Sequence, residues 1–474
     1  MRQLILLLLI GIALPRAFAQ EGQSLSLDEC IQYAVENAIT VQNAILDQEI
    51  AKSKVKETVG IGLPQVSGSI GLQHSPTLQR FFSAYNPNGG FGVDTQTAND
   101  LGIDEGEVFA AENFFQLKSA GDMNLTVNQL IFNGSYIVGL QASNAYQELS
   151  IRQANQTREE VALNVSKAYY NLLILREQLE LLDANVDRID TLYYNTAAMV
   201  ENGFAEKIDA DRIKVTLNNL KSEQANLSSI ETVSIKLLKL QMNYPFNEPM
   251  DISGDLSEMI FEQVESQQSE GWSYNTRPDY QVMEVQRELQ NLNIKNKYAE
   301  ALPTLGAFAT LGRSTQSPNF GGLFKSNSSF TEVEDQIGVD SWYGYSALGL
   351  SLSWNLFTGL QRNHQIQQQK MELEKIENGF TMMEQSIDLE IEQSNINLSN
   401  AQQQLEVQDE NQSLATEIYT ISKIKYEEGV GSNLEVIEAN TALKEAQTNY
   451  YSALYNAIIA QLELKKALGI LYNN

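Results

Sequence analysis

The chain has 474 residues, a formal net charge of −28 at pH 7, one cysteine and two histidines. This length exceeds that of one ordinary domain, and the negative charge disfavours binding to nucleic acid or to anionic lipid surfaces. The single cysteine, Cys30, excludes an internal disulfide and a multi-cysteine metal site, and the separated His74 and His364 form no metal-ligand cluster.

Residues 1–19 are predicted to be a secretory signal peptide. Arg2 precedes an apolar run, and Ala17 and Ala19 form a small-residue cleavage site. The run is too short to span a bilayer as a helix, which disfavours the alternative of a membrane-anchoring first helix. No later stretch resembles a transmembrane helix, so any contact with a membrane would use strands or a partner protein.

The first repeat, residues 20–243, is predicted to begin with helices and then form strands near 63–73 and 124–132. In each strand, alternate positions carry apolar residues, as in a membrane β-barrel, although Gln129 interrupts the second. A loop, residues 74–122, joins the two strands. Strands of a small soluble sheet are the alternative for any single one of them.

A very long helix is predicted over residues 135–200, because no proline lies between Pro87 and Pro245. At 1.5 Å per residue it would extend roughly 100 Å, too long for one compact domain. A hairpin tip at 201–207 and a helix at 208–242 follow. The long helix carries a coiled-coil heptad seam, formed by Val161, Val165, Ala168, Leu172, Leu175, Leu179, Leu182, Val186 and Ile189.

Residues 244–277 are predicted to be a linker lying against the outside of the helices, and residues 278–474 a second repeat. The second repeat is expected to follow the same plan as the first. A loop, residues 313–343, joins its two strands. An interfacial aromatic belt is expected where Trp342, Tyr343, Tyr345 and Trp354 flank or enter the second of these strands. Its elements are a helix at 279–300, strands near 302–312 and 346–357, a long helix at 360–427, a tip at 428–433 and a helix at 434–468.

An internal duplication explains why the two repeats follow one plan. "VENGFAEKIDADRIKVTL", from Val200, aligns with "YEEGVGSNLEVIEANTAL", from Tyr426, at a shift of 226 residues. "VNQLIFNG", from Val127, aligns with "LSWNLFTG", from Leu352, at a shift of 225. Four strands cannot close a barrel, for which about eight is the practical minimum. Because open strand edges are not tolerated in lipid, the chain is expected to oligomerise.

The sequence resembles a TolC-type outer-membrane efflux protein of the outer membrane factor family. The resemblance rests on "LSLDECIQYAVENA", the Leu-Pro strand starts, "WNLFTG" and "YEEGVGSNLEVIEANTAL". It implies an α+β membrane protein: a homotrimer with a 12-stranded β-barrel, four strands per chain, continued by a long α-helical coiled-coil barrel. It implies the outer membrane of a Gram-negative bacterium, with the helices extending into the periplasm, and partnership with a periplasmic adaptor (membrane fusion) protein and an inner-membrane transporter.

The resemblance also implies roles for residues at the hairpin tips, at the periplasmic end. Gly203, Phe204, Gly429, Val430 and Gly431 are expected to dock the adaptor. A second set is expected to form the periplasmic gate and its cation selectivity: Glu435, Glu438, Asp209, Arg212 and Tyr426. Here the two glutamates, on one helix face, would form stacked acidic rings, and Asp209 and Arg212 would pair with Tyr426 or with each other. Ordinary solvated glutamates are the alternative.

Departures from the family pattern affect the gate. The family often has Asp where this chain has Glu435 and Glu438, and an Arg where this chain has Gly431, so the closing tie of the gate is in question.

No enzyme activity and no cofactor are expected. "GGLFKS", from Gly321, lacks the Gly-Lys pair of a P-loop, and no serine elbow is present. The predicted function is a passive exit duct of a tripartite efflux or export system, driven by an inner-membrane pump. The alternatives are the outer-membrane component of a type I protein secretion system and a secreted coiled-coil scaffold without a pore. Neither the substrate nor the pump can be named from the sequence.

Overall fold

The chain divides into two compact units, each of which is described by itself below. Unit 1 comprises residues 1–51, 146–288 and 374–474, and unit 2 comprises residues 52–145 and 289–373. The predicted signal peptide lies outside the described residues. The computed structural model describes residues 24–89, 93–111, 113, 115–254, 256, 272–325 and 341–472.

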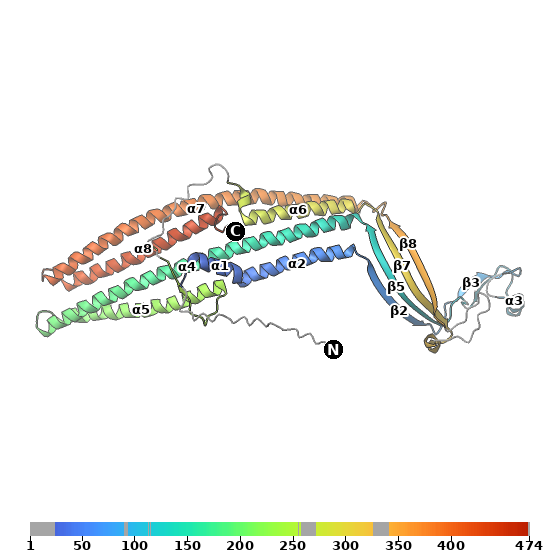
Figure 1. The fold of residues 1–474 in the computed structure, drawn as a ribbon, viewed down its shortest axis with the longest axis horizontal. Coiled ribbons are helices and arrows are strands. Elements are labelled where there is room, and N and C mark those ends of the chain that lie inside the picture. The colour runs from blue at the N-terminus through green and yellow to red at the C-terminus, as the bar shows by residue number, and fades with distance from the viewer. Residues whose placement is uncertain are drawn as a thin grey trace, which may run out of the picture. The chain divides into compact units, whose positions relative to one another are not determined.

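Unit 2 is built on a four-stranded antiparallel sheet with the order β2-β5-β7-β8 (Figure 1). Its strands are β2 (Gln65–His74), β5 (Ser119–Phe132), β7 (Thr304–Ser317) and β8 (Tyr343–Ser353). Among the described residues, no further strand pairs with the outer edges of β2 and β8. The sheet is therefore open at both edges.

Three strands extend further toward the connecting loops than the sequence predicted. The structure has β5 from Ser119 rather than 124, β7 to Ser317 rather than 312, and β8 from Tyr343 rather than 346. The extensions of β5 and β7 pair with each other, from Asp122↔Ser314 to Ser119↔Ser317. Their small and polar residues show no apolar alternation, so the sequence pattern did not reveal them.

At the other end, β8 stops at Ser353, so the predicted strand end at 357 is wrong. The last pair of the ladder is Thr304↔Ser353, and the residue before Thr304 is Pro303, which has no backbone N–H to continue it. The Trp354 indole N–H instead donates to Ala301 O at 3.0 Å. The connection then turns through two residues with positive φ, Gly359 at 61° and Leu360 at 65°.

The loop between β2 and β5 contains its own small elements. A two-stranded hairpin pairs β3 (Phe81–Ala84) with β4 (Val108–Ala111), and α3 (Thr95–Leu101) lies between them in the chain. The loop after β7 begins with a 3₁₀ turn, η3 (Phe320–Phe324).

Long helices make up most of the remaining chain. Each long helix is followed by an antiparallel partner in unit 1, α4 by α5 and α7 by α8, with both turns at the same end (Figure 1). No described helix combines the length and the apolar character needed to cross a bilayer. The helices are α1 (Leu27–Asn37), α2 (Ile39–Ile61), α4 (Gly134–Glu201), α5 (Lys207–Met242), α6 (Pro278–Ala299), α7 (Gln361–Glu427) and α8 (Asn433–Ala467).

The heptad seam of α4 forms the core of unit 1, as its spacing predicted. Eight of its nine residues are buried, and Leu179 is half-buried. Leu182, Val186 and Ile189 pack on Ile213 and Leu217 of α5. Nearer the N-terminal end of α4, Val165 and Leu172 belong to a buried cluster that includes residues of α1, α5 and α8 and the buried Cys30. Burial, and then the charge of Glu29, raise the pKa of the Cys30 thiol to about 12, which keeps it protonated and unreactive.

The segment that follows α5 lies partly inside this core. The short strand β6 (Asp251–Ile252) pairs in parallel with β1 (Ser24–Leu25), and the Tyr169 hydroxyl donates to Ser253 O. Met250, Ile252 and Leu256 belong to the same buried cluster as the heptad seam. A second connection, η2 (Tyr274–Thr276), leads into α6.

Candidate functional site

The sheet of unit 2 has one apolar face, which the strand register defines. Residues directly opposite each other on neighbouring strands share a face of the sheet. The paired residues therefore show which apolar positions of the four strands lie on the same face. Leu348 of β8 is 87% exposed and Ile70 of β2 is 76% exposed, although both are large aliphatic side chains. The apolar face comprises Val66, Ile70, Leu72, Met123, Leu125, Val127, Leu305, Ala307, Ala309, Leu311, Leu348, Leu350 and Leu352, and its polar members include Gln129, Arg313 and Ser346.

The opposite face of the sheet is polar. Thr126 and Thr310 share a hydrogen bond of 3.1 Å between their hydroxyls. The Asp122 carboxylate accepts hydrogen bonds of 2.8 Å from Asn124 and from the Tyr345 hydroxyl. A sheet with one water-compatible face and one face of exposed aliphatic side chains suits a boundary between water and lipid.

The two hairpin tips of unit 1 are built on left-handed glycines. Gly203 has φ 79° and Gly429 has φ 75°, a backbone conformation that residues other than glycine rarely adopt. At the first tip, the Phe204 N–H donates to Met199 O at 2.8 Å, and at the second the Val430 N–H donates to Lys425 O at 2.9 Å. These bonds end α4 and α7 and leave Phe204 and Val430 both 80% exposed.

Gly431 is held against the end of α7. Its N–H donates to Lys425 O at 2.9 Å, and a Cβ added to it would lie 2.9 Å from Lys425 Cβ and 3.1 Å from Tyr426 N. A larger residue would force this turn to shift. The turn is therefore too tight for a side chain at position 431, and glycine fits it.

Two hydrogen bonds connect the first hairpin to the second near the tips. The hydroxyls of Thr196 in α4 and Tyr426 in α7 lie 2.9 Å apart, and Asn433 Nδ2 donates to Asp209 O at 3.1 Å. The Asp209 carboxylate lies 3.8 Å from the Arg212 guanidinium, so these two residues pair with each other. Tyr426 bonds to Thr196 instead. An exposed pair of this kind contributes only about 0–1 kcal/mol.

Glu435 and Glu438 both lie on the exposed surface in the first turns of α8. The Ser432 hydroxyl caps the helix by accepting from Glu435 N at 3.2 Å. A carboxylate in the first turn is favoured by the positive end of the helix dipole. Their spacing of three residues places both carboxylates on one side of α8, where neighbouring copies of the chain would be needed to form a ring.

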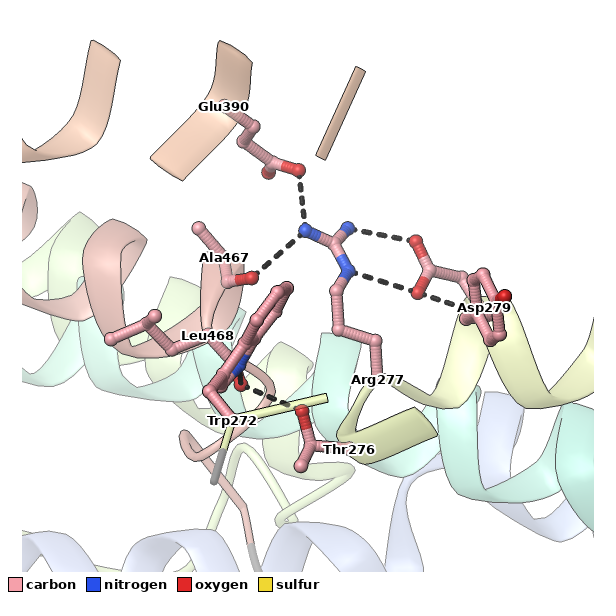
Figure 2. Close-up of polar contacts among 8 residues, drawn as sticks. Trp272, Thr276, Arg277, Asp279, Glu390, Ala467 and Leu468 are labelled. Atoms are coloured by element: carbon pink, nitrogen blue, oxygen red, sulfur yellow. Dashed lines mark hydrogen bonds and ion pairs between the residues drawn. The ribbon is translucent and has the colours of Figure 1, made fainter. Parts of the chain in front are cut away.

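Sequence analysis missed a buried ionic cluster at the start of α6, shown in Figure 2. The Arg277 guanidinium, 7% exposed, lies 2.7 Å from both Asp279 and Glu390, and donates to Ala467 O at 3.0 Å. Trp272 Nε1 and the Thr276 hydroxyl donate to Leu468 O. The cluster thus caps the C-terminal end of α8.

Glu159 of α4 is a buried acid whose pKa responds to the charges of this cluster. Burial raises its pKa to about 7, and the charges of Asp279 and Glu390 contribute further, against Arg277 and Lys466. Burial also opposes the charge of Arg277, but hydrogen bonds to Asp279 and Glu390 outweigh it, so the Arg277 pKa is raised. Arg277-Pro278-Asp279 was a usable helix-start signal, but its partners lie 113 and 190 residues away.

Comparison with protein families gives one match, to the outer membrane efflux protein family, over residues 274–470. The matched part of the chain is therefore similar to outer membrane efflux proteins. The match covers the second strand pair, the second long helix and the second hairpin, including Glu435 and Glu438. The resemblance to TolC-type efflux proteins expected from the sequence is thereby confirmed. A comparison with curated proteins gives no match.

Solved structures of outer-membrane channels share the fold of the whole chain. The CmeC outer membrane channel of Campylobacter jejuni is 16% identical, with a TM-score of 0.68 over 96% of this chain and 90% of that one. The open state of the MtrE outer membrane channel of Neisseria gonorrhoeae is 18% identical, with a TM-score of 0.68 over 94% and 89%. The outer membrane protein VceC of Vibrio cholerae is 14% identical, with a TM-score of 0.65 over 94% and 96%.

The family match agrees with the role predicted from the sequence. The outer membrane efflux protein family, which residues 274–470 match, has a transport function and not a catalytic one, as the sequence predicted. Long helices combined with four strands per chain are confirmed as the fold of this class of channel.

Proposed function

We propose that three copies of the chain form one passive conduit through the outer membrane, with a barrel of 12 strands continued by a barrel of helices. Each copy would contribute the sheet β2-β5-β7-β8. The repeated plan of two strands, a long helix and a hairpin supports an internal duplication as its origin.

One observation carries this proposal: an open sheet whose apolar face extends across all four strands. Free strand edges are costly in lipid, because the backbone groups there have no water to bond. Joining β8 of one copy to β2 of the next removes the edges, turns the apolar face to lipid and encloses the polar face. A secreted scaffold without a pore leaves this exposed apolar face unexplained.

The hairpin tips are proposed to be the periplasmic gate. The bonds Thr196–Tyr426 and Asn433–Asp209 hold the two hairpins of one copy together, so opening would move them as a pair or break these bonds. Rings of Glu435 and Glu438 from three copies would attract cations to the entrance. The exposed Phe204 and Val430, beside Gly203, Gly429 and Gly431, are the proposed docking points for a periplasmic adaptor.

Energy would come from an inner-membrane transporter that acts through the adaptor. Residues in the conduit wall would set which ions enter, while the pump would select the substrate. A type I protein secretion system remains the second candidate, since the same wall would serve a protein cargo.

Single-channel recording in planar bilayers tests the conduit and its gate together. The purified protein is expected to conduct with a preference for cations, and E435Q combined with E438Q is expected to reduce that preference several-fold. Glu445, further along α8, provides the matched control, E445Q, which should leave selectivity unchanged. A protein that never conducts contradicts the conduit, whereas unchanged selectivity in the double variant removes only the two glutamates from the gate.

Cysteine crosslinking tests the docking points. The native Cys30 is buried and its pKa of about 12 keeps it from reacting, so F204C and V430C report on their own positions. Both are expected to crosslink to a co-expressed adaptor, and a cysteine at Ser229, on the exposed face of α5, should not.

A further inference from the structure

Arg313 is an exposed cation on the apolar face of the sheet. It lies opposite Met123 of β5 and Gly344 of β8, in line with Leu311 two residues earlier in β7. Among the described residues it forms no ion pair. The nearby acid, Asp122, is on the polar face, and its two oxygens accept from Asn124 and Tyr345. Within the described part of the chain, the guanidinium is therefore available to an anionic ligand.

An apolar hollow of about 640 Å3 lies beside Arg313. Its wall is formed by the side chains of Ile70, Met123, Leu125 and Leu311. Gly68 also lines the hollow and leaves space there because it has no side chain. A Cβ added to Gly68 would meet no atom closer than 3.8 Å. A hollow with a free cation at one end has the two parts needed for an anion attached to a hydrocarbon chain.

The height of Arg313 on the sheet agrees with the headgroup level of a membrane. It lies nine residues after Thr304, the first residue of β7, which is about 30 Å along a strand and about 23 Å along the normal at the usual barrel tilt. The apolar band of such barrels is about 25 Å tall. A lipid-facing arginine is costly at mid-bilayer and tolerated at the interface.

A tryptophan immediately beyond Arg313 marks the same interface independently. A Cβ added to Gly121, the next position outward on this face, would lie 2.8 Å from Trp342 Cη2, so the indole covers that position. Trp342 Nε1 donates to Leu323 O at 3.1 Å within the η3 turn. Tryptophan is enriched at the membrane–water interface.

We propose that Arg313 and the hollow form a binding site for a phosphorylated lipid of the outer leaflet. The guanidinium would hold the phosphate through charge-assisted hydrogen bonds, and one acyl chain would lie along Ile70, Leu125 and Leu311. This inference rests on the proposed function, because it requires the apolar face to be turned toward lipid.

Native mass spectrometry of the purified protein in an uncharged detergent tests the site, with phosphatidylglycerol as the probe. R313Q is expected to weaken phosphatidylglycerol binding about tenfold or more, since hydrogen bonds to a charged group are lost. G68L is expected to weaken it as well, by filling the hollow without disturbing the backbone. R80Q, which removes an exposed arginine between β2 and β3, should bind like the original protein.

Two further probes separate the parts of the lipid. Diacylglycerol, which lacks the phosphate, and inorganic phosphate, which lacks the chains, should each bind at least tenfold more weakly than phosphatidylglycerol. Equal binding of diacylglycerol, or unchanged binding by R313Q, overturns the site. Full competition by inorganic phosphate together with an unaffected G68L overturns the role of the hollow.

Bilayer conductance distinguishes failure of the lipid site from failure of the proposed conduit. R313Q and G68L should conduct as the original protein does, because neither residue lies on the polar face. A protein that conducts but shows no selective lipid retention contradicts the lipid site alone, and one that does not conduct contradicts the conduit.

Discussion

At the scale of single residues, Arg277 is a buried cation that connects the start of α6 to α7 and to the end of α8. Its one guanidinium contacts Asp279, Glu390 and the carbonyl of Ala467. Because the group is buried, removing it leaves two carboxylates and a helix end without a partner. The two carboxylates are partly exposed, so water compensates part of this loss, whereas the helix end loses its partner outright.

Arg277→Ala is therefore expected to lower the free energy of unfolding by about 1–3 kcal/mol, because hydrogen bonds to charged groups are lost. Arg277→Lys should recover part of that loss, because lysine keeps the charge but cannot reach three partners in the same plane. Arg287→Lys is the matched control, since Arg287 is 38% exposed and its partners lie 3.7 and 3.9 Å away. Urea unfolding in detergent measures all three. Equal effects of R277K and R287K would contradict the cap.

Glu159 predicts a pH dependence with a definite sign. Its pKa is raised from 4.5 to about 7 in the folded chain, so the folded state binds this proton more tightly than the unfolded state. Its contribution to stability is complete below about pH 4.5 and is lost as the pH rises through about 7. The original protein should therefore lose stability between pH 5 and pH 8 through this group.

Glu159→Gln is expected to remove that part of the pH dependence and to stabilise the protein at pH 8 by on the order of 2 kcal/mol relative to the original. At pH 5 the two proteins should be nearly equal, because Glu159 is then mostly protonated. Urea unfolding at the two pH values measures the difference. Glu160→Gln, one residue along and on the exposed side of α4, serves as the control. A constant offset between E159Q and the original protein at both pH values would exclude this origin.

At the scale of elements, the hairpin tips combine local rules with contacts that no local rule contains. The turn glycines Gly203 and Gly429 were visible in the sequence, because helix ends favour glycine in the left-handed conformation. The bonds Thr196–Tyr426 and Asn433–Asp209 were not visible, because each joins residues more than two hundred positions apart. Propensity identifies a turn but not what it contacts.

The strands show the same difference between features that follow from local sequence and features that depend on distant partners. The apolar alternation from Leu348 to Leu352 was read correctly, because a side-chain period of two is the signal that the lipid-facing side requires. The end of β8 was predicted four residues too late, because the sequence of β8 alone does not show that its partner begins after Pro303. The outer ends of β5 and β7 were missed, because small polar residues form a ladder without producing an apolar pattern.

Two glycine substitutions, one at the second hairpin tip and one inside α4, are expected to change stability in opposite directions. Gly429→Ala should destabilise the second hairpin by about 1 kcal/mol, since alanine must adopt φ near 75°. Gly139→Ala, inside α4 with open space around it, should instead stabilise by about 0.5–1 kcal/mol. Hydrogen exchange at residues 424–436 and at 135–143 measures the two effects locally. Stabilisation by G429A would show that the left-handed turn is not kept in the protein.

At the scale of the whole molecule, the proposed conduit requires the apolar face of the sheet to be turned toward lipid. Leu348 lies opposite Ala309, five residues after the start of β7, so it would be about 13 Å along the membrane normal and close to mid-bilayer. Leu348→Arg should then cost about 2–4 kcal/mol in every copy. Because a trimer carries the substitution three times, the penalty should be enough to prevent a stable barrel.

Ala347→Arg provides the contrast, since Ala347 is the preceding residue on the same strand and lies opposite Thr310 on the polar face. Both substitutions add the same side chain to an exposed position, so they differ only in the face that carries the charge. The fraction of protein recovered as a detergent-resistant oligomer after folding into liposomes measures the outcome. L348R should lose most of this fraction and A347R should retain it, with altered conductance, because its guanidinium would enter the water-filled interior. Equal recovery of the two variants would mean that lipid does not contact the apolar face, and the open sheet would then have to be covered by another protein.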